Sequence, residues 1–369
     1  MDAQPPFHPV LPQAAALLLL VAAGLLFSGC YTLTQGVSML GYLGRAVPLE
    51  ELAGPETGDT GSGGPPSDED AEKTARFVER VYDIRRFAAE LGLKESANYT
   101  RYVELDRDYL AAVVSAAAQD SFTRHEWWFP VVGKVPYKGF FNVKDARKEQ
   151  GRLEKRGLDV WVRGVDAFST LGWFKDPLYS YMRDYSDYRL ADLLIHELLH
   201  ATVYIKGQSQ FNEELAEFVG TEGARLYIEQ KYGRESPEYQ AIFDSEADNT
   251  TYVAYLQGLI AELEAVYNSA APQEEKLARK AEIIRESQGR FERDYDTLFT
   301  GDNYRGFSEL PINNAYLDLY RLYYEGNSFY RELYEKSGSS LTRFIAAAKT
   351  LTSREKDPNG ALAAALLRQ

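Results

Sequence analysis

The segment His196-Glu-Leu-Leu-His200 constrains this chain more than any other. Residues four apart on an α-helix lie on one face, so His196 and His200 would present two imidazoles to one point. Glu197 lies on the adjoining edge, where its carboxylate would reach a water beside a bound ion. This H-E-x-x-H spacing is typical of Zn²⁺ sites. The alternative is a buried helix whose histidines bond to backbone carbonyls. The chain has only four histidines, and finding two of them here favours the metal site.

A third ligand is expected from the next helix, because catalytic Zn²⁺ takes three protein ligands and leaves one position for water or substrate. Lys206–Gln210 is a short polar connection with a turn glycine, and a second helix follows it. Two antiparallel helices joined in this way bring a carboxylate of the second helix to the ion. The residues available are Glu213, Glu214 and Glu217. Glu213 and Glu217 share a face, whereas Glu214 points about 100° away.

The histidine segment, Val203-Tyr204 and Phe211-Asn-Glu213 together resemble a family of bacterial zinc aminopeptidases of the gluzincin type, many of them predicted lipoproteins. The likeness extends over most of the chain that follows residue 30. Its further motifs are Tyr31-Thr32, Gln35-Gly36, Tyr99–Tyr102, Phe129–Gly133, Tyr137–Gly139, Phe168–Phe174, Asp176-Pro177 and Asn313–Ala315. The resemblance implies that Glu213, the glutamate of the Asn-Glu pair, is the third ligand.

The chain departs from the pattern of that family in two respects, at three positions. Its members carry cysteines at the places of Trp128 and Lys134, so the disulfide that these imply is absent here. Glu217 stands where the family has a small or hydroxyl residue. Because zinc histidines usually donate their second N–H to a carboxylate or carbonyl, Glu217 is a candidate acceptor for His196. An ordinary solvated helix charge is the competing interpretation of Glu217.

The first thirty residues indicate export and a lipid anchor. Leu11–Gly29 is an apolar run of the length of a signal-peptide core. Phe27-Ser-Gly-Cys30 resembles a bacterial lipobox, which would make Cys30 the acylated first residue of a mature lipoprotein. Cys30 is the only cysteine, so no disulfide is expected. We therefore expect a membrane-anchored lipoprotein of the bacterial cell envelope, facing the periplasm or the exterior. An uncleaved anchor is the alternative.

Charge and composition limit the partners. A formal net charge of −14 argues against nucleic acid and against docking on anionic lipid. We divide the chain into a signal peptide (1–29), a juxtamembrane segment (30–52), a disordered acidic insertion rich in Gly and Pro (53–70), an α+β catalytic region (71–235), a helical C-terminal subdomain (236–355) and a tail (356–369).

The fold expected is an α+β, zincin-like fold with a small mixed sheet and a mostly helical C-terminal half. Apolar residues at helical spacing predict helices over 70–91, 143–157, 187–205, 211–232, 236–268, 273–298, 312–335 and 340–351. Alternating or β-branched runs predict strands over 109–114, 127–132, 137–141, 159–163 and 168–172. Ser186 is the expected N-cap of the zinc helix.

The strand 168–172 is the expected partner of the substrate. An edge strand above the metal pairs with an extended peptide through main-chain hydrogen bonds. On this hypothesis Ser169, Thr170, Leu171 and Gly172 bind the substrate. The alternative is an ordinary internal strand and turn.

A tyrosine is the expected donor to the oxyanion of the tetrahedral intermediate, since no histidine follows His200. Tyr316 and Tyr323 share one face of the helix expected over 312–335, although such a stripe is more often core. Asn313 and Asn314 either cap this helix or hold substrate.

These residues together predict a zinc-dependent peptidase in which Glu197 acts as general base toward the attacking water. Aminopeptidase activity is implied by the resemblance alone, because the sequence assigns no carboxylate to a substrate's α-ammonium group. An endopeptidase is the alternative within the enzyme class. A non-catalytic, lipid-anchored envelope protein with a structural metal is the alternative outside it.

Overall fold

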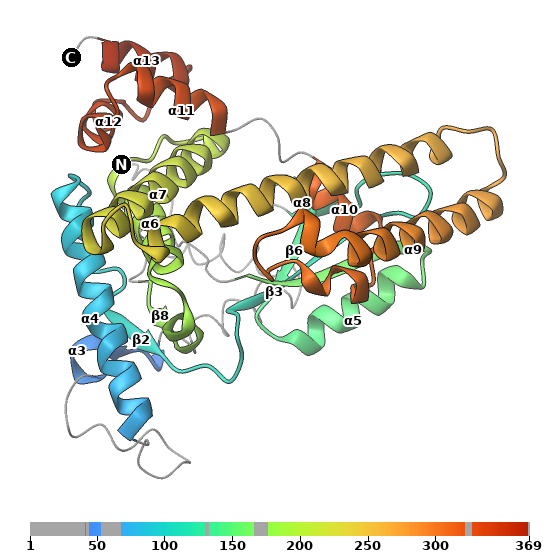
Figure 1. The fold of residues 1–369 in the computed structure, drawn as a ribbon, viewed down its shortest axis with the longest axis horizontal. Coiled ribbons are helices and arrows are strands. Elements are labelled where there is room, and N and C mark those ends of the chain that lie inside the picture. The colour runs from blue at the N-terminus through green and yellow to red at the C-terminus, as the bar shows by residue number, and fades with distance from the viewer. Residues whose placement is uncertain are drawn as a thin grey trace, which may run out of the picture.

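The structure is a computed structural model, and it describes residues 41, 44–52, 68–129, 133–165, 176–321 and 327–367. It is an α+β protein in which helices predominate (Figure 1). The helices are α3 (Leu49–Leu52), α4 (Asp68–Glu90), α5 (Val143–Glu154), α6 (Asp187–Thr202), α7 (Ser209–Tyr232), α8 (Pro237–Tyr267), α9 (Gln273–Leu298), α10 (Asn314–Arg321), α11 (Asn327–Lys336), α12 (Leu341–Ala348) and α13 (Pro358–Leu367), with 3-10 turns η1 (Ser180–Asp184) and η2 (Arg305–Glu309). The strands are β1 (Val47–Pro48), β2 (Arg101–Val103), β3 (Ala111–Ala118), β4 (Trp127–Phe129), β5 (Gly133–Val135), β6 (Tyr137–Phe140), β7 (Leu158–Val165) and β8 (Leu178–Tyr179).

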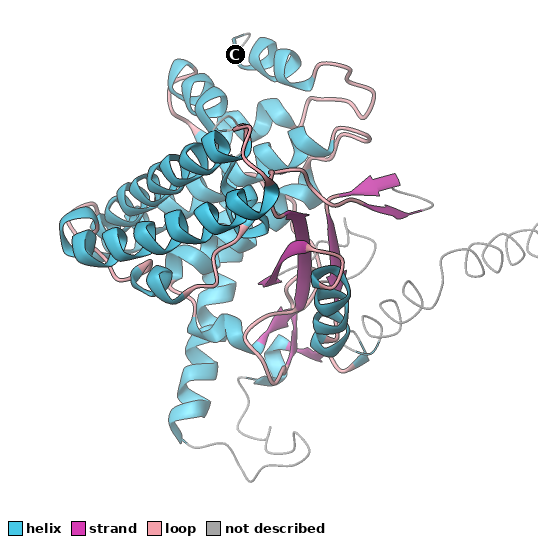
Figure 2. Cartoon of the chain, turned by 90° about the vertical axis from the view of Figure 1, so that its right-hand side faces the viewer, coloured by secondary structure: helices cyan, strands magenta, loops and turns pink. Residues whose placement is uncertain are grey.

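The strands form three small sheets where one small mixed sheet was expected. In the largest, β3 pairs antiparallel with β6 on one side and β7 on the other. A second sheet is mixed, since β2 pairs antiparallel with β1 and parallel with β8. The third is the β4–β5 hairpin, which projects from the body (Figure 2). Helix α5 covers one side of the β3 sheet, and Leu153 is fully buried there.

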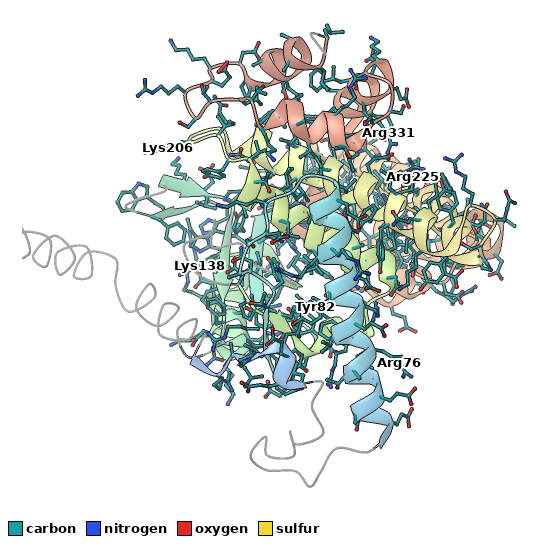
Figure 3. The ribbon with its side chains drawn as sticks, turned by 90° about the vertical axis from the view of Figure 1, so that its left-hand side faces the viewer. Arg76, Tyr82, Lys138, Lys206, Arg225 and Arg331 are labelled. Atoms are coloured by element: carbon teal, nitrogen blue, oxygen red, sulfur yellow. The ribbon has the colours of Figure 1, made fainter. Side chains whose placement is uncertain are left out.

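The two helices that carry the expected ligands form an antiparallel pair. Ser186 caps α6 by accepting a hydrogen bond from the Arg189 N–H at 3.2 Å. The helix ends at Thr202, three residues before the expected end, because Val203 is extended. The turn between α6 and α7 contains Lys206, which Figure 3 labels, and Gly207, whose φ angle is +80°. Only glycine adopts that backbone angle readily.

The helices expected to form one C-terminal subdomain over 236–355 divide between two hydrophobic clusters. Helices α8, α9 and α10 share a hydrophobic cluster of their own around Phe291. Helices α11, α12 and α13 instead pack into the main core with α6 and α7, as Phe344 beside Phe218 shows (Figure 1). The expected tail at 356–369 contains α13, whose Leu362 is fully buried in that core.

Several predictions concern residues outside those that the structure describes. They are the signal peptide and Cys30, most of the juxtamembrane segment, nearly all of the acidic insertion, the strand 168–172 and Tyr323. The helix expected over 312–335 is seen as α10 up to Arg321 and α11 from Asn327, and residues 322–326 are not described. Within the described part of the chain, no helix combines the length and apolarity needed to cross a bilayer.

Candidate metal centre

His196, His200 and Glu213 meet at one point between α6 and α7. The two histidine Nε2 atoms are 3.2 Å apart. Oxygens of the Glu213 carboxylate lie 3.7 Å from His196 Nε2 and 3.6 Å from His200 Nε2. Three ligands about 2.0–2.2 Å from one tetrahedral ion would lie about 3.3–3.6 Å apart. The separations therefore fit a single ion among the three side chains, and two imidazoles with one carboxylate are a donor set that suits zinc.

Asn212 fixes the turn that delivers Glu213 to the histidines. Its buried amide brackets the backbone of Ile205, accepting from the N–H and donating to the carbonyl, both at 2.9 Å. The end of α6 is thereby tied to the first turn of α7. This gives the Asn-Glu pair a local physical meaning: the asparagine closes the turn and the next residue faces the histidines.

The charges of the three residues are coupled. The nearby imidazoles of His196 and His200 hold the pKa of Glu213 well below its usual value. Burial lowers the pKa of His196, but the carboxylates of Glu213, Glu197 and Asp192 outweigh burial, and the net pKa is raised. The cluster thus supplies a negative environment that favours a cation.

Asp192, which the sequence analysis missed, is the carboxylate beside His196 on its own helix. It lies one turn before His196 on α6, and burial raises its pKa to about 6. Its Oδ1 accepts from the Thr221 hydroxyl at 3.4 Å. Glu217, the expected acceptor for His196, is an exposed residue of α7. Asp192 is therefore a second candidate acceptor for His196 beside Glu217, and its i−4 spacing from His196 was the available signal.

A family match accompanies this geometry. Residues 34–361 match the model of the family described as "Putative aminopeptidase". The chain belongs to this family. The match spans the whole described region except for its last few residues, so α6, α7 and the C-terminal helices all lie within it. No curated protein and no solved structure matches the chain. The family name indicates a peptidase, and hence peptide substrates.

Glu197 is 7% exposed and follows His196 directly in the sequence. The pKa of His196 responds to its charge, so the Glu197 carboxylate is close to the ligand cluster. Burial, and then the nearby charge of Glu197, raise the pKa of the Tyr99 phenol, so these two buried side chains lie near each other. The sequence analysis noted the motif 99–102 but assigned Tyr99 no role.

Tyr316 lies in the α8–α10 cluster and not among the ligands. Its hydroxyl bonds to that of Tyr252, and its ring packs against Trp161 and Tyr320. It is 5% exposed. These contacts are those of a core residue, so they give no support to the expected oxyanion role.

Asn313 and Asn314 both make hydrogen bonds within the protein, and Asn313 takes the capping role that was one of the two expected alternatives. Asn313 caps α10, its side chain accepting from the Tyr316 N–H at 3.1 Å and donating to the Val160 carbonyl at 2.9 Å. Asn314 is fully buried. Its amide donates to the carbonyls of Ala118, Gln119 and Ser121 and accepts from the Tyr267 hydroxyl. Every polar atom of the Asn314 side chain is thus engaged within the protein.

Proposed function

We propose that this protein is a zinc-dependent aminopeptidase of the zincin type, with His196, His200 and Glu213 as ligands and Glu197 as general base. One observation carries the proposal: two imidazoles and a carboxylate from consecutive helices meet with separations of 3.2–3.7 Å. Family membership supports the peptidase class and the aminopeptidase activity.

The ligands leave one side of the centre open. The side chain of His200 is 3% exposed, whereas those of His196 and Glu213 are 25% and 61% exposed. The cluster is therefore closed on the His200 side and reaches solvent on the Glu213 side. Three protein ligands with an open side are typical of catalytic zinc, while structural zinc usually has four. This argues against a purely structural metal.

A zinc ion bound there would polarise the scissile carbonyl and lower the pKa of a water to about 7. Glu197 accepts the proton of the attacking water on its carboxylate and then delivers this proton to the leaving amine. Glu197 is buried, so little bulk water competes for its carboxylate. Asn212, which is buried, ties the end of α6 to the first turn of α7 and so keeps Glu213 beside the histidines.

The test is peptide hydrolysis by wild type and Glu197→Gln, each with and without a chelator. We expect wild type to hydrolyse peptides and to lose this activity with chelator. Glu197→Gln should keep its zinc and its helical circular dichroism but lose at least about 100-fold in kcat, the usual contribution of a general base. Undiminished turnover by Glu197→Gln would refute the role of Glu197.

Substrates with free and blocked N-termini separate the peptidase types. An aminopeptidase cleaves only the free-amine peptide, since it must bind the α-ammonium group. Cleavage of N-blocked peptides would show an endopeptidase instead. Zinc binding without hydrolysis of either substrate would leave the non-catalytic envelope protein.

A further inference from the structure

A cavity lies beside α9, away from the candidate metal centre. Its volume is about 440 Å³, within the range of about 300–1,000 Å³ that is usual for small-molecule sites. Its lining comes from α9, from the loop between η2 and α10, from Gln119 after β3 and from Asp159 near the start of β7. In Figure 1, α9 lies on the right of the molecule and the pair of α6 and α7 on the left. The lining includes no residue of α6 or α7, so the cavity is a separate site.

The floor of this cavity is buried and carries a lysine. Lys280, Ile284 and Ile312 are each 8% exposed. The Lys280 ammonium donates to the Gln119 carbonyl at 2.9 Å and to Asp159 Oδ2. An ammonium group has three donors, and within the described part of the chain it has these two acceptors. One N–H of a buried cation therefore remains for a ligand.

Asp159 also keeps an acceptor for a ligand. Its Oδ2 accepts from Lys280 and, at 2.8 Å, from the backbone N–H of Asn314, which fixes the carboxylate. Each carboxylate oxygen can accept about two hydrogen bonds, yet none reaches Asp159 Oδ1 from the residues that the structure describes. The Asp159 side chain is 11% exposed and lines the cavity. A molecule in the cavity can therefore reach this oxygen beside the lysine.

The mouth of the cavity adds a second cation. Arg285 and Ala281 lie four residues apart on α9, line the cavity and are exposed. Arg285 forms no ion pair with any residue in the described ranges of the chain. Gln288 holds the opposite wall in place, since its amide donates to the carbonyls of Phe307 at 3.1 Å and Leu310 at 2.8 Å. The walls offer apolar surface from Leu277, Ile284, Leu310, Pro311 and Ile312.

These groups define the ligand. Because Asp159 and Lys280 are in contact, the cationic and anionic groups of a ligand that binds both must also lie close together. In an α-amino acid the ammonium and the carboxylate are attached to one carbon atom. We propose that the cavity binds a free α-amino acid with an apolar side chain, with its ammonium on Asp159 Oδ1, its carboxylate on Lys280 and Arg285, and its side chain on the apolar walls.

This site goes beyond the proposed function and does not depend on it. An aminopeptidase releases free amino acids, so under the proposed function the cavity binds a product at a distance from the metal centre.

The first experiment measures the binding of leucine to the full chain by titration calorimetry, beside two analogues. Leucinamide lacks the carboxylate and 4-methylpentanoate lacks the ammonium. We expect one leucine per chain, and affinities at least about 10-fold weaker for both analogues, the usual loss for a hydrogen bond to a charged group. No leucine binding at millimolar concentration would overturn the proposal. Equal affinity for 4-methylpentanoate would also overturn it, because the site would then take simple carboxylates.

The second experiment places leucine in the cavity by substitution. Ala281→Trp puts an aromatic side chain at the mouth, and Ala278→Trp is its matched control, since Ala278 is exposed on α9 but does not line the cavity. Arg285→Gln removes the second cation, and Arg279→Gln, also exposed on α9, is its control. We expect Ala281→Trp to abolish leucine binding and Arg285→Gln to weaken it about 10-fold or more. Both controls should bind leucine as wild type does. Wild-type affinity in Ala281→Trp and Arg285→Gln would overturn the proposal.

His200→Ala separates this site from the metal centre. Leucine binding should persist in His200→Ala, whether or not the wild type hydrolyses peptides. If His200→Ala loses leucine binding while Arg285→Gln keeps it, leucine binds at the metal centre and the cavity site is wrong. Absence of chelator-sensitive hydrolysis in wild type would contradict only the proposed function.

Discussion

Gly220 lies on α7 where this helix contacts α6 beside the candidate metal centre. A Cβ added there would lie 2.8 Å from Asp192 Oδ1, 3.0 Å from the Asp192 carbonyl oxygen and 3.1 Å from His196 Cβ. Two of these three atoms cannot move without moving α6 itself. Gly220→Ala should therefore push apart the two helices that carry the ligands.

The magnitude follows from two opposing effects. Alanine is favoured over glycine inside a helix by about 0.5–1 kcal/mol. Overpacking of a close helix contact costs about 1–3 kcal/mol. The net loss in the free energy of unfolding should then be about 1–2 kcal/mol for Gly220→Ala. Gly258, inside α8, has no atom within 4 Å of an added Cβ. Gly258→Ala should thus stabilise the protein by up to about 1 kcal/mol.

Denaturant unfolding and zinc affinity measure the two consequences of Gly220→Ala. We expect its unfolding midpoint to fall and its zinc affinity to weaken, because displacement of His196 widens the cluster. Gly258→Ala should raise the midpoint and leave zinc affinity unchanged. If Gly220→Ala is as stable as Gly258→Ala, the close contact between α6 and α7 is not real.

Three other predictions follow from contacts away from the centre. Asn314→Ala leaves several buried carbonyls without a hydrogen-bond donor. It should lower the free energy of unfolding, measured by denaturant titration, by at least about 3 kcal/mol. A loss below about 1 kcal/mol would contradict the structural role of Asn314. Trp128 and Lys134 are paired directly across the β4–β5 hairpin, where Cα atoms lie about 4.5–5.5 Å apart. Cysteines placed at both positions (Trp128→Cys with Lys134→Cys) should therefore form a disulfide on oxidation, seen as the loss of two free thiols. If both thiols remain free, the pairing of residues 128 and 134 is wrong. Hydrogen bonds from Arg152 hold the pKa of Glu149 at about 2. The pKa of Glu149 in the folded protein lies below the value of about 4.3 in the unfolded chain. The Glu149 carboxylate therefore stabilises the folded state fully at pH values above about 4.3, and this contribution disappears as the pH falls toward 2. Because Arg152 is half exposed, Glu149→Gln should lower the free energy of unfolding by only about 1–2 kcal/mol at pH 7. If the difference in unfolding free energy between the variant and wild type does not change with pH, the assignment is wrong.

Local patterns predicted the helices that carry the centre. The Ser186 cap and the end of α7 at Tyr232 were both expected. Helix α9 spans 273–298 as expected, because its charged and apolar residues alternate at helical spacing and Pro272 precedes it. The i,i+4 spacing alone placed His196 and His200 on one face. These features depend on residues near each other in sequence.

The remaining parts depend on contacts between distant segments. The turn at Tyr99 is held by Arg85 and by the carbonyl of Asp176, and none of these spacings forms a pattern. The burial of α13 could not be predicted either, since its alanine-rich sequence has no clear apolar face and its partners lie far along the chain. From the sequence, Asn314 was expected either to cap a helix or to bind substrate. A polar residue of the core is recognised only once its hydrogen-bond partners are known.

Zinc content per chain tests the central claim most directly. Glu213→Ala and Glu214→Ala form a matched pair, because the residues are neighbours on α7 and Glu214 accepts instead from Gln210 at 2.8 Å. We predict one zinc per chain in wild type and in Glu214→Ala, and a large loss of zinc in Glu213→Ala and His200→Ala. Equal zinc in Glu213→Ala and wild type would contradict a centre built from these three ligands.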